Sequence, residues 1–310
     1  MHERTTTSPV ADLRGLWVPL VTPFDGRDEL DAASLRGLAD RVLRNGASGI
    51  VALGTTGEPA VLTNVEQRRV IEITSESCTE AGRSLIVGAG TNSTRTTINA
   101  VHALDGVAAI VGALIVVPYY TRPSPAAIVE HFRVVAAESP VPLVAYNVPY
   151  RTGRGLGAKE ILELASFPNV VGIKQAVGCI DADTLEVLRV APEHFHVFAG
   201  DDAFIAPTIL MGGDGAIAAA AHVCTPLFVA LVDAARAGDV RTARSIAHRL
   251  LPVVEAGFAE PNPAVWKAAL HALGEIPTPN LRAPMTSASV EATARIRTAV
   301  ASASARVAVS

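Results

Sequence analysis

The sequence predicts an α/β protein folded as a (β/α)8 TIM barrel with a C-terminal helical extension. Eight short apolar runs alternate with segments of helical periodicity over residues 13–225, at a spacing of about 25 to 30 residues. Eight βα units over roughly 220 residues fit the usual size of this barrel. An open, doubly wound sheet is the alternative, but the glycine-rich pattern G-x-G-x-x-G expected after its first strand is missing.

The strands are expected where Val, Ile, Leu and Ala cluster between turn residues. These runs cover residues 15–24, 49–53, 85–90, 113–118, 143–148, 170–175, 195–199 and 215–220. Apolar residues at helical spacing lie between them, and Thr63 or Asn64 is placed to cap the second helix. The helices are predicted over residues 34–45, from 64, from 93 or 94, 124–138, 158–165 and 204–211.

After Pro226 the strand pattern ends and only helical patterns follow. These helices are predicted over residues 227–237, 240–258, 264–273 and 287–303. We therefore expect a barrel over residues 13–225 and a C-terminal helical region over residues 226–310, with no linker between them.

The composition is that of a globular protein with a large core, because 49% of its 310 residues are hydrophobic and only 18% are charged. A formal net charge of −4 gives no basic surface for nucleic acid or anionic membrane. The N-terminus has no apolar signal-peptide core, and no apolar run reaches the length of a membrane span. We expect a soluble, cytoplasmic protein without nucleic-acid or membrane partners.

The sixth predicted strand, V-V-G-I-K-Q, is unusual because it sets Lys174 in a run typical of a strand buried on both faces. Burial lowers the pKa of a lysine, and a neutral lysine attacks carbonyl groups to form a Schiff base. The alternative is a strand-end lysine whose amine reaches solvent. Lys159 and Lys267 are the other two lysines among 26 Lys and Arg residues, and their amphipathic helical patterns predict solvated faces. Where arginine is the usual cation, a lysine in a strand favours a functional role.

In a parallel barrel the active site lies at the C-terminal ends of the strands. The turn G-T-T-G-E, residues 54–58, follows the second strand there. Its two hydroxyls and its backbone amides could hold a carboxylate, and an ordinary tight turn explains the pattern equally well.

All four tyrosines fall in two segments, with Tyr119 and Tyr120 after the fourth strand and Tyr146 and Tyr150 at the end of the fifth. A tyrosine hydroxyl beside a threonine hydroxyl can relay protons. Arg151, in the second segment, has the fork geometry that binds carboxylates. Together with the lysine of the sixth strand, these residues indicate an imine-forming site with a proton relay and anion recognition.

The aspartate pair Asp201–Asp202 after the seventh strand invites a metal interpretation. We expect no metal site, because no further Asp, Glu or His stands at ligand spacing nearby. His222, at the end of the eighth strand, is expected to have a structural or supporting role.

Seven segments occur in an order typical of one family: G-T-T-G-E, P-Y-Y-T-R-P-S, Y-N-V-P-Y-R-T-G, G-I-K-Q-A-V-G, A-G-D-D, E-P-N-P and L-R-A-P-M-T. From about Thr22 to Thr286 the chain resembles the dihydrodipicolinate synthase / N-acetylneuraminate lyase family of pyruvate-dependent class I aldolases. The resemblance implies a (β/α)8 barrel with a C-terminal helical region and a homotetramer built as a dimer of tight dimers.

The resemblance also implies catalytic roles. Lys174 forms the Schiff base with pyruvate, so that the covalent imine takes the place of a cofactor. Tyr146, Thr55 and Tyr120 form a proton-relay triad, in which Tyr120 reaches into the neighbouring subunit's site. Thr55 and Thr56 hold the pyruvate carboxylate.

For the second substrate, the resemblance implies that Arg151 binds the carboxylate of L-aspartate 4-semialdehyde and that the Ile217 carbonyl lines the pocket. The product is 4-hydroxy-tetrahydrodipicolinate, in lysine and diaminopimelate biosynthesis. A sibling aldolase or dehydratase that uses another aldehyde or a 2-keto sugar acid is the alternative, because imine chemistry does not fix the second substrate. A non-catalytic paralogue is a third possibility, against which the retained Lys174 and Tyr146 argue.

Several positions depart from the family pattern. Gln175 stands where Glu is common, Tyr150 where Ser is frequent and His222 where Asn is frequent. The histidines and the acid of the cleft where lysine inhibits some members are replaced by Asn64, Gln67 and Thr96. We therefore predict weak or absent lysine feedback.

Overall fold

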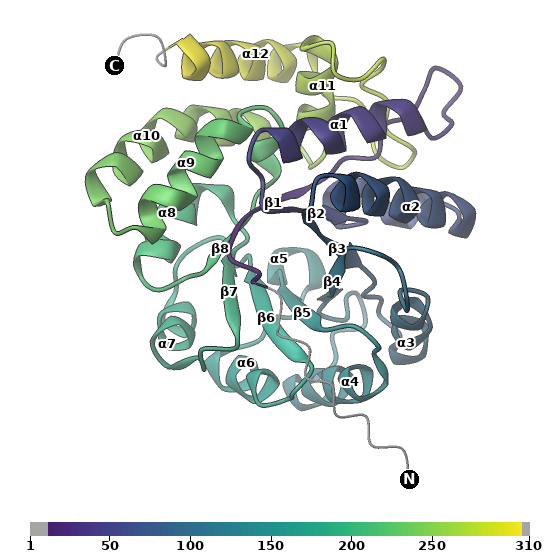
Figure 1. The fold of residues 1–310 in the computed structure, drawn as a ribbon, viewed down its shortest axis with the longest axis vertical. Helices are drawn as coiled ribbons and strands as arrows, with labels where there is room; N and C mark the ends of the chain where they lie inside the picture. Colours follow the sequence, from purple (N-terminus) through teal and green to yellow (C-terminus); the bar gives the residue numbers. More distant parts are fainter. Residues whose placement is uncertain (1–11, 306–310) are drawn as a thin grey trace.

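The computed structural model describes residues 12–305, and its strands form one closed parallel barrel (Figure 1). Neighbouring strands follow the order of the chain, and the last pairs with the first. The strands are β1 (Gly15–Pro19), β2 (Gly49–Ala52), β3 (Ser84–Gly88), β4 (Ile110–Val116), β5 (Leu143–Asn147), β6 (Val170–Gln175), β7 (His196–Ala199) and β8 (Gly215–Ile217). The predicted barrel is confirmed, and closure of β8 on β1 excludes the open sheet.

Helices cover the outside of the barrel between successive strands (Figure 1). The long ones are α1 (Ala32–Arg44), α2 (Asn64–Glu80), α3 (Thr94–His102), α4 (Pro125–Glu138), α6 (Ala158–Ala165), α7 (Ala182–Val190) and α8 (Ile205–Leu210). The sequence patterns did not delimit α7, although the Asp181 side chain caps its first turn by accepting from the Thr184 backbone N–H. Short helical turns follow the strands at α5 (Pro149–Thr152), η1 (Thr55–Gly57), η2 (Pro59–Val61), η3 (Asp202–Phe204) and η4 (Ala219–His222).

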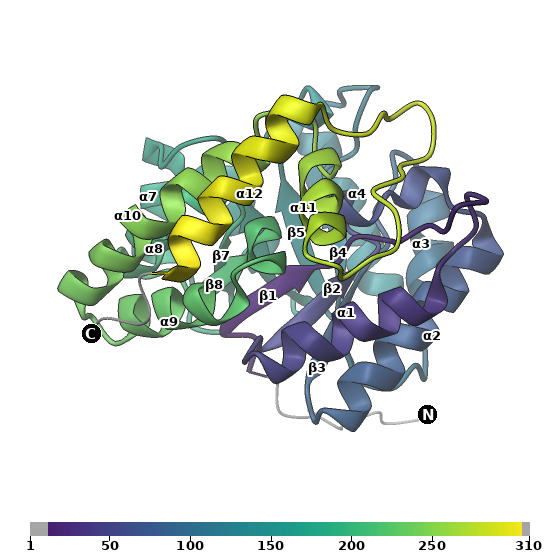
Figure 2. The same cartoon turned by 90° about the horizontal axis from the view of Figure 1, so that it is seen from above.

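After β8 the described chain is helical. The helices are α9 (Thr225–Arg236), α10 (Val240–Gly257), α11 (Ala264–Ala272) and α12 (Val290–Ala305). Helix α10 packs against α9 and α12, and α11 packs against α12 and η4. Figure 1 shows α11 and α12 on the side of the barrel that carries α1 and α10, and Figure 2 shows the same group from above. Within residues 12–305, no helix combines the length and the apolar character that a membrane span requires.

Two apolar layers hold the barrel together because strand side chains alternate between its inside and its outside. Trp17, Val51 and Phe198 belong to the inner cluster, and the Trp17 indole donates to the Leu13 carbonyl at 2.7 Å. Val18 and its counterparts on other strands belong to the outer cluster, which packs against the helices. With both layers filled by apolar side chains, the ends of the strands are left for polar groups.

The first and last strands are shorter than predicted. β1 ends at Pro19, because the following segment bonds outside the ladder: the Thr22 hydroxyl donates to the Gly57 carbonyl at 2.7 Å. β8 ends at Ile217, where the chain turns into η4. The division into a barrel of residues 13–225 and a helical region of residues 226–310 remains a prediction, and residues 306–310 lie outside the described part.

Candidate active site

Strand β6 places Lys174 beside Tyr146 of β5, inside the barrel. The two residues are register partners, and Lys174 Nζ lies 4.5 Å from the centre of the Tyr146 ring. Only 8% of Lys174 and 5% of Tyr146 are exposed. Gly200, directly after β7, leaves space for the lysine stem, since a Cβ there would lie 2.9 Å from Lys174 Cγ. The lysine is therefore buried, as its strand pattern predicted, and does not extend to solvent.

Burial controls the charge of the Lys174 amine, lowering its pKa to about 8. The carboxylates of Asp202 and Asp201 act in the opposite direction by favouring the ammonium form. Burial also raises the pKa of Asp202, and the positive charge of Lys174 partly offsets that effect. With this pKa about a tenth of the amine is neutral at pH 7, and the neutral form is the one that attacks a carbonyl carbon.

The turn G-T-T-G-E brings the Thr55 side chain close to Tyr146, the neighbour of this lysine. Burial raises the pKa of Tyr146, and the nearby Thr55 side chain partly offsets the rise. Thr56 is buried, and its hydroxyl accepts a hydrogen bond from Asn262 Nδ2 at 3.0 Å. Glu58 joins η1 to η2 in a left-handed conformation (φ 54°), which gives the turn its fixed shape. The segment is therefore both a tight turn and a source of hydroxyl groups.

Arg151 lies in α5, directly after β5, where its positive charge lowers the pKa of Tyr146. The guanidinium carbon lies 5.6 Å from the centre of the Tyr150 ring, and both side chains are exposed. Arg122 Nε donates to the Gly153 carbonyl at 2.9 Å, which ties the segment after β4 to the end of α5. Arg151 is thus placed at the solvent side of the site and forms no ion pair with another residue of the range 12–305.

Ile217 and Tyr120 are placed differently from each other. Ile217 is buried at the end of β8, within the inner cluster that also contains Tyr146. Tyr120 is 88% exposed with a φ of 69°, and its hydroxyl has no hydrogen-bond partner among residues 12–305. One chain therefore brings Lys174, Tyr146 and Thr55 together and leaves Tyr120 facing solvent.

Lys267 contradicts the prediction of a solvated face. It is 0% exposed, its Nζ lies 2.5 Å from Glu58 Oε1, and it donates to the Asn280 carbonyl at 2.8 Å. The helical pattern A-V-W-K-A-A-L is apolar on nearly all sides, and that signal would have predicted burial. Lys159 is exposed, as expected. Sequence analysis thus missed the contact between α11 and the G-T-T-G-E turn.

Gln175, the departure from the family's Glu, completes a buried amide network. Its Oε1 accepts from Asn147 Nδ2 at 3.0 Å and its Nε2 donates to Thr184 Oγ1 at 3.0 Å. Asn147 also exchanges two hydrogen bonds of 3.1 Å with the backbone of Leu156. Asn147 follows Tyr146 on β5, and Gln175 follows Lys174 on β6. These two side chains therefore link the two strands to each other and to the segment that carries Arg151.

His222 is a structural residue at the end of η4, the turn that follows β8. Its Nε2 accepts from the Val21 backbone at 3.1 Å, and its Nδ1 donates to the Ala219 carbonyl at 2.7 Å. Burial lowers its pKa to about 4, so the ring is neutral at pH 7. Among residues 12–305, no three His, Cys, Asp or Glu side chains are grouped for metal binding, the pair Asp201–Asp202 included.

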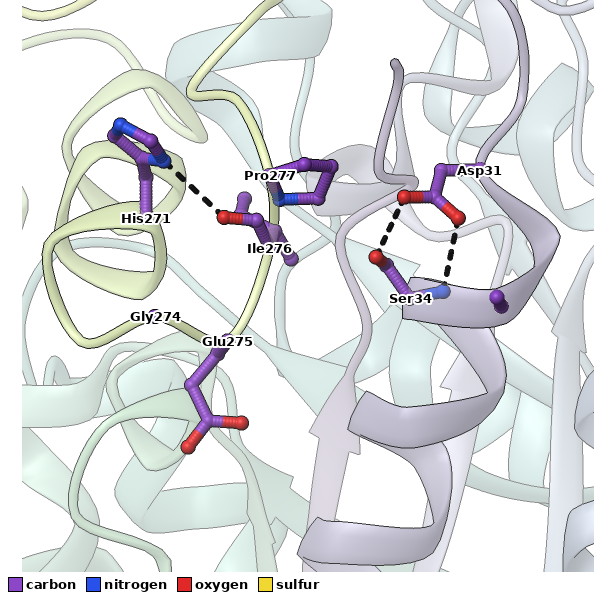
Figure 3. A pocket seen from close by; sticks show the side chains of 8 residues that line it. Asp31, Ser34, His271, Gly274, Glu275, Ile276 and Pro277 are labelled. Atoms are coloured by element: carbon purple, nitrogen blue, oxygen red, sulfur yellow. Dashed lines mark hydrogen bonds between the residues drawn. The ribbon is translucent and has the colours of Figure 1, made fainter.

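An open cavity of about 480 Å³ lies elsewhere, between the start of α1 and the segment after α11 (Figure 3). Its polar groups are engaged within the protein: Asp31 accepts from the Ser34 amide and hydroxyl, and His271 Nδ1 donates to the Ile276 carbonyl at 3.1 Å. Glu275 forms an ion pair of 3.0 Å with Arg41. None of the predicted site residues lines this cavity, so chemistry and not cavity size identifies the candidate site.

The chain is similar to known proteins over nearly its whole length. A model of the dihydrodipicolinate synthetase family matches residues 12–303. The 4-hydroxy-tetrahydrodipicolinate synthase of Neisseria meningitidis serogroup C (strain 053442) is 39% identical over 291 residues, which cover 93% of this chain and 98% of that protein.

Solved structures are similar over nearly the whole chain. The chloride-inhibited dihydrodipicolinate synthase from Acinetobacter baumannii, complexed with pyruvate, has a TM-score of 0.90 and 31% identity, covering 94% of this chain and 99% of that chain. A structure described as the first monomeric dihydrodipicolinate synthase variant has a TM-score of 0.91 and 31% identity, covering 96% of this chain and 98% of that chain.

Proposed function

The chain belongs to the dihydrodipicolinate synthetase family, and we propose that it condenses pyruvate with L-aspartate 4-semialdehyde through an imine on Lys174. The family resemblance inferred from seven sequence segments is thereby confirmed, and the chain is a lyase. The observation that carries the mechanism is Lys174 itself, a buried amine beside Tyr146 with a pKa lowered by burial. This reaction belongs to lysine and diaminopimelate biosynthesis.

The neutral amine of Lys174 attacks C2 of pyruvate, and loss of water from the carbinolamine gives the iminium ion. Removal of a proton from the C3 methyl group gives the enamine, with the iminium nitrogen as electron sink. The enamine carbon attacks the aldehyde carbon of the semialdehyde, and the new alkoxide takes a proton through Tyr146 and Thr55. The substrate's own amino group then attacks the imine carbon and displaces Lys174, which closes the ring and releases 4-hydroxy-tetrahydrodipicolinate.

Carboxylate recognition is divided between two segments. Thr55, whose side chain acts on Tyr146, and the buried Thr56 are proposed to hold the pyruvate carboxylate. Arg151 is proposed to bind the carboxylate of the semialdehyde, because its guanidinium lies at the solvent side of the site. The Ile217 carbonyl is proposed to line the pocket. Protein side chains and the imine on Lys174 account for every step, so we propose no cofactor and no metal.

The exposed Tyr120 supports an oligomeric site. We propose a homotetramer built as a dimer of tight dimers, in which Tyr120 of the partner subunit completes the proton relay with Tyr146 and Thr55. The strained backbone of Tyr120 and its exposure in the single chain favour this role, since neither serves the fold of one subunit. The Tyr120→Phe variant should lose turnover but keep imine formation. Full turnover by this variant would contradict the shared site. A wild-type chain that sediments as a monomer and still shows full turnover would also contradict it. A cytoplasmic location remains a prediction.

The function is tested by following pyruvate-dependent consumption of L-aspartate 4-semialdehyde with a coupled reductase. In parallel, borohydride traps the pyruvate adduct, and mass spectrometry locates it. Turnover with the adduct on Lys174 is expected. An adduct without turnover would favour a sibling aldolase or dehydratase, the candidate that Tyr150, Gln175 and His222 keep open. Neither adduct nor turnover would indicate a non-catalytic paralogue. In the same assay, lysine at micromolar concentrations is expected to inhibit weakly or not at all.

A further inference from the structure

Helix α11 is attached to the G-T-T-G-E turn at two points. Asn262, two residues before the helix, donates from Nδ2 to Thr56 Oγ1 at 3.0 Å. Lys267, on the helix itself, pairs with Glu58 at 2.5 Å. The two contacts meet the turn at residues only two positions apart, one of which is a proposed ligand of the pyruvate carboxylate. The C-terminal helical region thus reaches the reacting centre.

The Lys267–Glu58 pair fixes the distance between helix and turn. Lys267 is 0% exposed and the Glu58 side chain 4%, so separating the two would leave a charge buried without its counterion. Both groups have further partners: Lys267 donates to the Asn280 carbonyl and lies 4.0 Å from the centre of the Phe24 ring, and Glu58 Oε2 accepts from the Arg282 backbone at 3.3 Å. A pair held from several sides permits little movement of α11 against the turn.

The hydrogen bond from Asn262 limits the directions in which the Thr56 hydroxyl can donate its own hydrogen. A hydroxyl has one donor and two acceptor lone pairs, and the amide N–H of Asn262 occupies one of these lone pairs. The hydrogen of Thr56 is therefore left to donate elsewhere. The Oδ1 of the same amide is buried without a hydrogen-bond partner among residues 12–305, which is costly. Fold stability alone gives no reason to keep that amide in this position.

We propose that Asn262 is a positioning residue that holds the Thr56 hydroxyl as a hydrogen-bond donor to the pyruvate carboxylate. The Lys267–Glu58 ion pair keeps α11 at the distance this arrangement needs. The inference rests on the proposed function, because it requires pyruvate at Thr56. It assigns the E-P-N-P segment, which the sequence analysis noted but left without a role, to recognition of the first substrate.

The test compares two trapping probes, pyruvate and methyl pyruvate, in which a methyl ester replaces the charged carboxylate. Each is reduced onto Lys174 with borohydride over a range of concentrations, and mass spectrometry gives the half-saturating concentration. For Asn262→Ala we expect this concentration to rise about five- to tenfold for pyruvate, the effect of one weakened hydrogen bond to a charged group. For Asn262→Asp we expect a rise of about 100-fold, because a carboxylate takes the Thr56 hydrogen and repels the substrate. Methyl pyruvate should change less than about twofold in both variants.

Asn99→Ala is the matched control, because Asn99 is an exposed asparagine on α3 whose side chain forms no hydrogen bond with the described residues. Equal weakening of both probes in Asn262→Ala would assign a merely structural role to Asn262 and overturn the inference. Unchanged trapping of pyruvate in Asn262→Ala would also overturn it, while adduct formation in the wild-type chain would leave the proposed function intact. A wild-type chain that traps no pyruvate on Lys174 would overturn both proposals.

Discussion

Two lysines of this chain are buried, and we propose opposite roles for them. Lys174 lies on β6 beside the ring of Tyr146, and Lys267 lies on α11 beside the ring of Phe24. Burial lowers the pKa of both amines. The difference is the counterion: Lys267 forms an ion pair with Glu58 at 2.5 Å, whereas Lys174 forms no ion pair within 4.0 Å among the described residues.

Burial alone therefore does not make a lysine a nucleophile. A carboxylate in direct contact holds the ammonium form and converts the buried charge into a structural link. Asp202 and Asp201 act on Lys174 from a greater distance. Their carboxylates partly offset the lowering of its pKa by burial and leave part of the amine neutral. The comparison predicts that loss of Lys174 removes chemistry, and that loss of Lys267 removes stability.

The largest expected effect is that of Lys174→Ala on activity. Without the amine no imine forms, so turnover in the coupled assay should fall by more than about 10³-fold. The free energy of unfolding should stay within about 1 kcal/mol of wild type, because a costly buried amine is removed together with its packing. Lys159→Ala, at an exposed lysine, is the control. Retained turnover in Lys174→Ala would overturn the imine mechanism.

The second prediction concerns Lys267→Met. Glu58 is left buried without its counterion, so urea denaturation should show a loss of about 3–5 kcal/mol in the free energy of unfolding. The double variant Lys267→Met with Glu58→Gln should recover more than half of that loss, because the unpaired charge is gone. Lys174→Met should show no comparable loss. If Lys267→Met were as stable as wild type, the ion pair would not be the link between α11 and the turn.

The third prediction is the pH dependence of imine formation. Only the neutral amine attacks pyruvate, so kcat/KM for pyruvate should rise with pH through about 8 and level off above it. Asp202→Asn removes a charge that favours the ammonium form, so the midpoint should move down by about one pH unit. The double variant Lys267→Met with Glu58→Gln should keep the wild-type midpoint, even where its free energy of unfolding differs from that of wild type. An upward shift in Asp202→Asn would contradict the direction of this interaction.

The sequence predicted the barrel because it depends on local patterns repeated along the chain. Apolar strands and amphipathic helices are visible in any short window, and Lys174 could be recognised from one strand. Contacts between distant segments leave no such pattern. The pairing of Lys267 with Glu58 spans more than 200 residues. The apolar helical stretch around this lysine predicts an amphipathic helix, but residues 264–270 are all buried.

The catalytic group shows the same division. Tyr146, the G-T-T-G-E turn and Arg151 could be predicted to lie close together because each stands at or follows the end of a predicted strand, and strand ends meet at one side of a barrel. Asn262 could not be placed, since it lies in a connection outside the βα repeat and reaches Thr56 only through the packing of α11. Tyr120 shows a further limit, because its proposed role depends on a second subunit.

The smallest expected effect is that of Gln175→Glu, which restores the residue common in the family next to Lys174. Strand geometry directs side chain 175 away from the barrel interior, so a charge there acts on the amine from outside. The midpoint of the pH profile should move up by less than about half a pH unit, opposite to the shift of Asp202→Asn. Turnover at pH 7 should fall by no more than about threefold.

The same variant should be less stable by about 1–2 kcal/mol, because the buried donor to Thr184 is lost. The Thr184 hydroxyl cannot replace that donor, since it already donates to Asp181 Oδ1 at 2.6 Å. Gln175→Met, which removes the amide without adding a charge, separates the two contributions: it should lose stability and leave the pH midpoint unchanged. A large shift of the midpoint in Gln175→Glu would show that groups on both sides of the strand determine the pKa of the Lys174 amine, and not only groups in the barrel interior.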